Sequence, residues 1–223
     1  MGFTFSFDVI WKNIDVFLAG LLTTLQITGI SIVLGLFLGI FVAVFRLSRN
    51  FVVSKVTAAY IEFFRCTPVL VQLVWVFYCL PIVLGIELGN YVSSIIALTL
   101  YVGAIYGEAF RSGIQGIEQD QIDATVALGL SPVQRMRYVI LPQAIRIVIP
   151  VLLSNSVSLF KESSLVSTVG MSDLMYNGRI LSASTYRPVE ILTTVAVIYF
   201  IVAFPATLLT RKLEAALARK LER

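Results

Sequence analysis

The chain contains five apolar stretches without a single charged residue, and these limit its fold more than any other feature. They occupy residues 16–45, 66–86, 88–107, 147–160 and 191–210. A helix needs about 20 apolar residues to cross the hydrocarbon core of a membrane, and most of these stretches reach that length. Only 13% of all residues are charged, whereas soluble domains carry about 25%. The sequence therefore predicts an all-α, polytopic membrane protein.

We expect a single transmembrane domain over residues 1–223, with five spans near 16–45, 55–86, 88–113, 145–165 and 189–211. The second helix is expected to begin near Ser54 and to kink near Pro68, because proline interrupts helical hydrogen bonding. Gly35 and Gly39 form a GxxxG pair in the first span. Such a pair either lets another helix approach closely or reflects the ordinary glycine content of membrane helices.

The distribution of basic residues predicts how the chain is oriented. Lys and Arg mark the cytoplasmic side of short loops in membrane proteins. With the N-terminus outside and five spans, 13 of the 17 Lys and Arg residues fall on the inner side, Arg223 among them, and only Lys12, Lys161, Arg179 and Arg187 fall outside. Residues 115–142 and the C-terminal tail are therefore expected in the cytoplasm. The net charge of +4 reflects this topology rather than nucleic-acid binding.

Several kinds of chemistry lack their usual residues in this sequence. There is no histidine, which is the commonest metal ligand and acid–base catalyst. No GxxxxGK[ST] phosphate loop occurs, so the chain has no ATPase site of its own by this criterion. The carboxylates are scattered rather than paired. We therefore expect a transport subunit, not an enzyme, with no metal site and no cofactor of its own.

The cytoplasmic residues 115–142 contain the signals for two helices joined by a tight turn. Gly129 is placed to end the first helix, because glycine adopts the left-handed conformation of a C-terminal cap at little cost. Ser131 is placed as an N-cap, with Pro132 at the first helical position and Gln134 completing a capping box. Such a unit either contacts a partner or packs on its own bundle.

The same residues resemble the EAA loop of ATP-binding cassette (ABC) importer permeases. That signature reads Glu-Ala-Ala, three residues, Gly, nine residues, Ile, one residue, Leu-Pro. Here Asp123-Ala124-Thr125 stands for the triplet, Gly129 is in register, Val139 replaces the isoleucine, and Leu141-Pro142 closes the motif. Pro142 is also expected to end this unit before the fourth span begins.

Other segments are similar to the polar amino acid permeases within this family. Residues 64–72, FRCTPVLVQ, look like the family segment FRGTPLLVQ, with Cys66 at the glycine position. Residues 108–115, 141–144 and 161–167 match the same family, so the resemblance covers nearly the whole chain. It implies a type I ABC importer permease with five spans, located as a multi-pass protein in the bacterial cytoplasmic (inner) membrane.

The resemblance also implies partners. Two permease subunits, identical or different, pair within the lipid bilayer, and two ABC ATPase subunits bind ATP and Mg and dock beneath them. A separate extracytoplasmic solute-binding protein delivers the polar amino acid, and no nucleic acid is involved. The residues implied in coupling to the ATPase are Asp123, Ala124, Gly129, Leu130, Ser131, Pro132, Leu141 and Pro142.

Polar side chains within the spans are candidates for the substrate pathway, because they are costly in a membrane. The candidates lie on the second and fourth spans and are Thr67, Pro68, Val69, Gln72, Asn155, Ser156, Ser158, Glu162 and Ser163. The family's pathway runs between these two spans, which favours Thr67 and Ser156. The alternatives are that the hydroxyls bond their own backbone or join helices, and that Glu162 pairs with Lys161.

Other functional classes fit the sequence less well. An ion-coupled secondary transporter of small polar solutes would carry internal repeats and a buried ionisable relay, and the sequence displays neither. A membrane-embedded enzyme would need a histidine–aspartate or paired-carboxylate constellation. A scaffold without transport activity stays open at this point.

Overall fold

The computed structural model describes residues 6–221, with side chains from 6 to 217, so residues 1–5, 222 and Arg223 lie outside the described part. The regular elements within it are all helices. They are α1 (Asp8–Lys12), α2 (Ile14–Arg46), α3 (Phe51–Cys66), α4 (Val69–Leu84), α5 (Asn90–Gln115), α6 (Gln119–Ala127), α7 (Pro132–Arg135), a π-helical turn (Met136–Ile140), α8 (Leu141–Glu162), a 3₁₀ segment (Ser163–Val169), α9 (Leu174–Thr185) and α10 (Pro188–Leu221).

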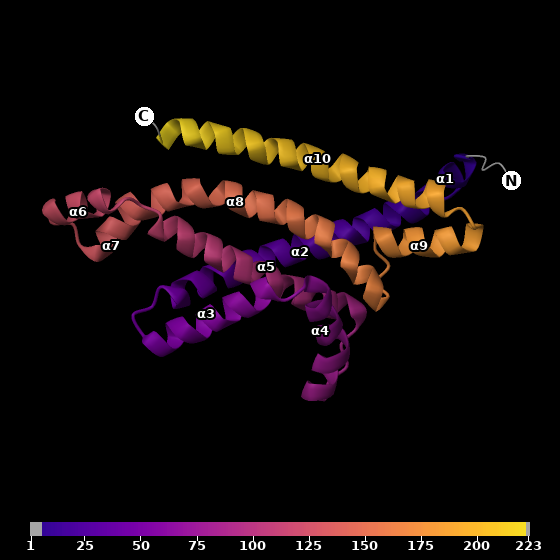
Figure 1. Ribbon diagram of the computed structural model, residues 1–223, viewed down its shortest axis with the longest axis horizontal. Coiled ribbons are helices and arrows are strands. Elements are labelled where there is room, and N and C mark those ends of the chain that lie inside the picture. Colours follow the sequence, from indigo (N-terminus) through magenta and orange to yellow (C-terminus); the bar gives the residue numbers. More distant parts are fainter. Residues whose placement is uncertain (1–5, 222–223) are drawn as a thin grey trace.

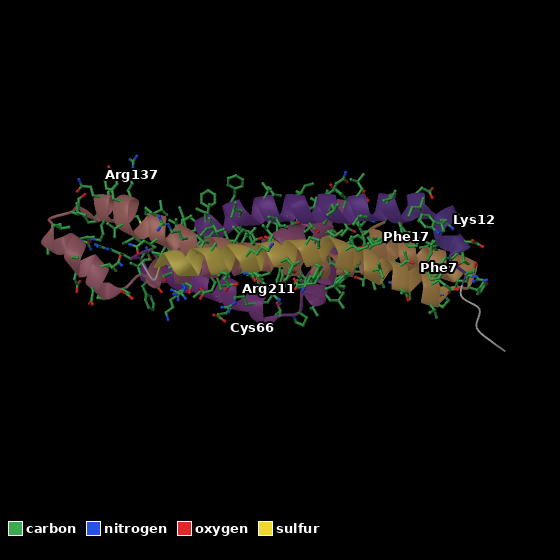
Figure 2. All side chains as sticks on the ribbon, turned by 90° about the horizontal axis from the view of Figure 1, so that it is seen from above. Phe7, Lys12, Phe17, Cys66, Arg137 and Arg211 are labelled. Atoms are coloured by element: carbon green, nitrogen blue, oxygen red, sulfur yellow. The ribbon has the colours of Figure 1, made fainter. Side chains whose placement is uncertain are left out.

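The long helices α2, α5, α8 and α10 run along the long axis of the molecule (Figure 1). Among the described residues, four helical stretches are long and apolar enough to cross a membrane, and the bent pair α3 and α4 makes a fifth candidate. Helices α6 and α7 lie at one end with the C-terminus, and α1 and α9 lie at the other. Arg137 and Lys12 likewise mark opposite ends (Figure 2). We therefore refer to the α6–α7 end as cytoplasmic and to the α9 end as outer.

Cysteine labelling tests this orientation. Gly89 precedes α5 and Ser131 precedes α7, and both positions are exposed. In a background without Cys66 and Cys79, we expect Gly89→Cys to react with an impermeant maleimide in intact cells. Ser131→Cys is expected to react only after permeabilisation, because the basic-rich side of a membrane protein faces the cytoplasm. Labelling of Ser131→Cys from outside would reverse the assignment.

The second span differs from its prediction. Residues 55–86 were expected to form one kinked helix, but α3 begins at Phe51 and is followed by α4 at an angle of 107°. Asn50 sets the earlier start, because its side chain accepts hydrogen bonds from the amides of Val52 and Val53. Pro68 separates the two helices, since it lacks an amide hydrogen and forces Thr67 into extended backbone. Helix α4 consequently lies across the long axis (Figure 1).

Helices α2 and α5 form the core through glycines on both partners. A Cβ atom at Gly39 would lie 2.6 Å from the Cβ of Tyr106, and one at Gly107 would lie 2.8 Å from the Cβ of Val42. Gly35 faces Val102 in the same way. Of the two interpretations of the GxxxG pair, close approach of another helix is therefore correct. A second glycine pair, Gly103 and Gly107 on α5, packs against α2 in the same contact.

The fourth span is not separated from the cytoplasmic loop. Helix was expected over 145–165 with a stop at Pro142, but helical backbone runs from Pro132 to Val169 and contains the π-helical turn Met136–Ile140. Pro142 directly follows the π-helical turn, so its missing amide hydrogen falls where the regular hydrogen-bond pattern of the helix is already interrupted. The cytoplasmic unit is therefore joined directly to a membrane span.

The remaining spans follow their predictions more closely. The first and third predicted spans, 16–45 and 88–113, correspond to α2 and α5. The fifth, 189–211, continues as a single helix through the charged tail to Leu221. Helix α9 was not predicted, and it occupies the connection between the last two spans.

Candidate functional site: a polar cavity and a cytoplasmic helical pair

A cavity of about 510 Å³ lies between α3, α5 and α8. Its polar lining consists of side chains from all three helices, namely Arg65, Tyr101, Glu108, Ser112 and Asn155. The residues from α5 share one face because their spacing of seven and four follows the helical repeat. This is the part of the molecule where charged groups lie within membrane-spanning helices and border an open volume.

The two charged side chains of the cavity, Glu108 and Arg65, differ in how closely they are paired with an opposite charge. Glu108 is held by Arg111 through two hydrogen bonds, of 2.5 Å to Oε1 and 2.8 Å to Oε2. Within the described part of the chain, the one ion-pair contact of Arg65 is a 4.0 Å approach to Glu62, and its side chain is 44% exposed. A guanidinium carries five donors, so Arg65 keeps hydrogen-bonding capacity directed at the cavity. The cavity therefore presents a partly exposed guanidinium whose hydrogen-bonding capacity is incompletely used.

Glu162 joins the cavity wall through Tyr101, which also lines the cavity. The Tyr101 hydroxyl donates a hydrogen bond of 3.2 Å to Glu162 Oε1. Glu162 Oε2 is buried and has no hydrogen-bond partner in the described part of the chain. Lys161 does not approach the Glu162 carboxylate within salt-bridge distance among the described residues, although its charge still acts on Glu162.

Thr67 and Gln72 stabilise the break between α3 and α4. The Gln72 amide nitrogen donates to the carbonyl of Phe64 at 2.9 Å and to the hydroxyl of Thr67 at 2.7 Å. The Thr67 hydroxyl in turn donates to the carbonyl of Phe63. These bonds satisfy carbonyl groups at the end of a helix, which otherwise lack partners. Both side chains line an apolar cleft of about 370 Å³ in the elbow, not the polar cavity.

Ser156 also lies apart from the polar cavity. Its hydroxyl contacts Tyr106 at 2.7 Å and donates to the carbonyl of Leu152, and it borders a separate apolar groove between α2, α8 and α10. Thr67 and Ser156, the two residues favoured for the pathway, therefore border separate apolar clefts in this subunit. Asn155 is the polar residue of α8 in the cavity lining, because one residue along a helix turns the side chain by about 100°.

The remaining pathway candidates do not line the polar cavity. Ser163 is buried and donates to the carbonyl of Phe160, which is the alternative considered for such hydroxyls. Val69 packs against the main core, Pro68 is exposed, and Ser158 is partly buried. Arg65, Glu108 and Ser112 carried a signal in the sequence, since all three stand in the family-like segments, but Tyr101 carried none beyond its helical spacing.

At the cytoplasmic end, the predicted helix–turn–helix is confirmed. Gly129 has a φ of 71°, in the left-handed region that disfavours other residues. Ser131 forms the expected capping box, in which its hydroxyl accepts from the amide of Gln134 and the Gln134 side chain accepts from the amide of Ser131. Asp123 is exposed and accepts a hydrogen bond from Gln119.

This helical pair exposes apolar side chains to water. Leu128 is 77% exposed and Val133 is 76% exposed, and Val126 and Tyr138 are also exposed. The unit lies at one end of the molecule (Figure 1), and the rest of the described chain leaves these side chains uncovered. They therefore do not pack on their own bundle, and the surface is typical of a binding site for another protein.

Comparisons with known proteins place the chain among transport proteins. Residues 35–222 match the family model of the binding-protein-dependent transport system inner membrane component. The glutamate/aspartate import permease protein GltK of Escherichia coli O6:H1 is 32% identical over 219 residues, covering 95% of this chain and 98% of that protein. The arginine transport system permease protein ArtQ of Bacillus subtilis is 31% identical, covering 95% and 96%.

Solved structures give the same result. The structure described as an amino acid ABC transporter with histidines matches with a TM-score of 0.90 and 32% identity, covering 96% of this chain and 100% of that one. An inward-facing structure of the MetNI methionine ABC transporter matches with a TM-score of 0.74 at 21% identity, which shows a shared fold.

Proposed function

Because this chain belongs to the binding-protein-dependent transport system inner membrane components, we propose that it is the permease subunit of an ATP-driven importer for polar amino acids. The observation that carries this proposal is its similarity, over nearly the full length, to import permeases named for glutamate/aspartate and for arginine. The chain is a multi-pass membrane protein, and we place it in a bacterial inner membrane.

The proposed complex contains more than this chain. Two ATPase subunits bind ATP and Mg, a second permease subunit completes the membrane unit, and an extracytoplasmic binding protein delivers the amino acid. The exposed apolar surface of α6 and α7 supports the first of these contacts. An ion-coupled secondary transporter remains the second candidate, but nothing in the fold favours it over the importer.

The polar cavity is proposed as part of the substrate passage. Arg65 binds the α-carboxylate of the amino acid, because guanidinium and carboxylate form paired hydrogen bonds. Asn155 and Ser112 offer neutral donors and acceptors to a polar side chain. Arg111 neutralises Glu108, so this carboxylate does not repel an anionic substrate.

The continuous helix from Pro132 to Val169 is proposed as the coupling device. Its cytoplasmic end belongs to the exposed helical pair, and its membrane portion contributes Asn155 to the cavity. Closure of the ATPase displaces the helical pair, and the attached span moves with it as a rigid body. Alternating access through rigid-body movement of helices around a membrane-buried site follows the general pattern of transporters.

Replacing Arg65 tests the passage. Arg65→Ala is expected to lower the uptake efficiency for labelled amino acids about tenfold or more, because a hydrogen bond to a charged group contributes roughly 1.5–3 kcal/mol. Ser156→Ala is the matched control, since Ser156 lies outside the cavity, and should keep near-normal uptake. Both complexes are purified to verify assembly. Unchanged KM and maximal rate in an intact Arg65→Ala complex would remove this cavity from the passage.

A further inference from the structure

Helix α9 lies at the outer end of the molecule, and the transport mechanism above gives it no role. It has only 12 residues, too few to cross a membrane, and it packs against α2 and the start of α10 (Figure 1). A short connection between two spans needs no helix. Specific contacts hold α9 in place, and several of its side chains line a surface groove.

Polar contacts fasten α9 to the spans on its inner side. The Thr24 hydroxyl on α2 accepts a hydrogen bond of 3.1 Å from the amide of Leu174, and the Asn177 side chain donates one of 3.2 Å to the carbonyl of Val16. Gly20 and Gly178 permit close packing, since a Cβ at Gly20 would lie 2.8 Å from the Cα of Leu174. The position of α9 is thus fixed relative to α2 and α10.

Asp173 completes this attachment. It is fully buried and caps α9 by accepting hydrogen bonds from the amides of Met175 and Tyr176, while Tyr199 on α10 donates to the same carboxylate at 3.4 Å. Burial raises the pKa of this carboxyl to about 6. The helix is held as a rigid support, and a binding surface that is already ordered loses less entropy when a partner binds.

A groove lies beside this support at the outer end of the molecule. It has a volume of about 540 Å³ and runs between the 3₁₀ segment, α9 and the start of α10. Its lining is mixed in character and includes Ser167, Thr168, Tyr176, Arg179, Ile180 and Ser182. Ile180 is 55% exposed. Arginine, tyrosine and exposed apolar side chains with small polar residues around them are typical of protein interfaces.

The charge of the groove is positive. Arg179 is exposed and forms no ion pair with any other described residue. The neighbouring Arg187 is bound to Glu190 at 3.0 Å, and Asp173 is buried, so neither carboxylate offsets Arg179 at the surface. Most basic residues of the chain lie toward the opposite end. An unpaired arginine in a groove on the outer face is consequently available for an acidic partner.

We propose that the groove between the 3₁₀ segment and α9 binds the extracytoplasmic solute-binding protein, with Arg179 contacting a carboxylate on its surface. This assignment rests on the proposed function, because a binding-protein-dependent importer must receive its loaded binding protein at this end. It adds where the partner binds and which chemistry recognises it. A lipid headgroup suits the site less well, since recognition of anionic membranes uses clusters of basic residues and the groove offers one.

Charge reversal tests the assignment in the complete transporter. The complex is reconstituted in nanodiscs, and ATP hydrolysis is measured against the concentration of the purified solute-binding protein that supports its uptake, loaded with amino acid. Arg179→Glu should raise the half-saturating concentration about tenfold at low salt and less at high salt, because charges at an interface act on association. Arg179→Lys should stay within about twofold of the original.

Lys12→Glu is the matched control, since it reverses an exposed outer charge on α1, outside the groove, and no change is expected. A photo-reactive amino acid at Ile180 should also cross-link to the binding protein. Equal effects of Arg179→Glu and Lys12→Glu, an unaltered half-saturating concentration, or an effect that requires anionic lipid in the nanodisc would each overturn the assignment. If the unmodified complex shows no stimulation by the binding protein, the proposed function itself fails, and this inference fails with it.

Discussion

Gly107→Leu is expected to prevent accumulation of the folded protein. Gly107 lies on α5 directly against Val42 of α2, and even a Cβ atom would approach the Cβ of Val42 to 2.8 Å. Backbone-near atoms of a valine cannot rotate away, so the two helices would have to separate. These helices form the core of the molecule, and in a membrane such contacts depend on close packing rather than on the hydrophobic effect.

A graded series makes this expectation quantitative. Gly107→Ala should destabilise the protein by about 1–3 kcal/mol, the usual range for overpacking. Adding Val42→Ala removes methyl groups that the new side chain meets, and should recover part of the loss. The measurement is the amount of monodisperse protein in mild detergent and its thermal unfolding midpoint.

Gly29→Leu provides the control on the same helix. A Cβ at Gly29 would meet no atom within 4 Å, and its substitution should leave folding nearly unchanged. If Gly107→Leu accumulates and unfolds like Gly29→Leu, the helices tolerate separation, and the glycine contact does not determine the fold.

The same contact illustrates what a sequence can and cannot predict here. The charge-free stretches predicted the four helical stretches that are long and apolar enough to span, with the bent pair α3 and α4 as a fifth candidate, because the cost of charge in a membrane is independent of tertiary structure. They did not predict which helix contacts Gly35 and Gly39. The second glycine pair in this contact, Gly103 and Gly107 on α5, is recognisable only once α2 and α5 are side by side. Pairing between helices is a property of the assembled fold.

Sequence rules for where helices begin and end also failed at positions where packing against other helices determines the backbone. Pro68 predicted an interruption, but the angle of 107° depends on where α4 finds packing partners. Pro142 was expected to stop a helix, yet it follows a π-helical turn, where the regular hydrogen-bond pattern is already interrupted and the helix continues. Helix α9 was missed because a hydropathy pattern detects only long apolar segments, although the cap residue Asp173 stood before it.

The candidate site was the least predictable part. Polar residues on the second and fourth spans were treated as candidates, but a difference of one position decides whether Asn155 or Ser156 borders the cavity. Tyr101 lies outside the family-like segments, so no feature of the sequence selected it. By contrast, the cytoplasmic unit was predicted in detail, because caps and tight turns are encoded by a few adjacent residues.

That cytoplasmic unit carries the last prediction, in which Gly129→Val reduces uptake to background. Gly129 has a φ of 71° and no atom near its Cβ position, so the cost arises from the backbone alone. A left-handed conformation costs an ordinary residue about 1–2 kcal/mol, and a β-branched residue adopts it least readily. The turn should therefore rearrange, which displaces Leu128 from the surface it shares with Val133 and deprives the ATPase of its binding site.

Gly129→Asn separates this cause from a general effect of substitution, because asparagine adopts the left-handed conformation with little strain. Each complex is purified, and ATPase retention, hydrolysis stimulated by the loaded binding protein, and uptake are measured per assembled complex. Asparagine should preserve all three, whereas valine should lose retention or uncouple hydrolysis from uptake. If valine lowers only the expression level and each assembled complex transports normally, the turn serves folding alone and the helical pair does not transmit ATPase closure to the attached span.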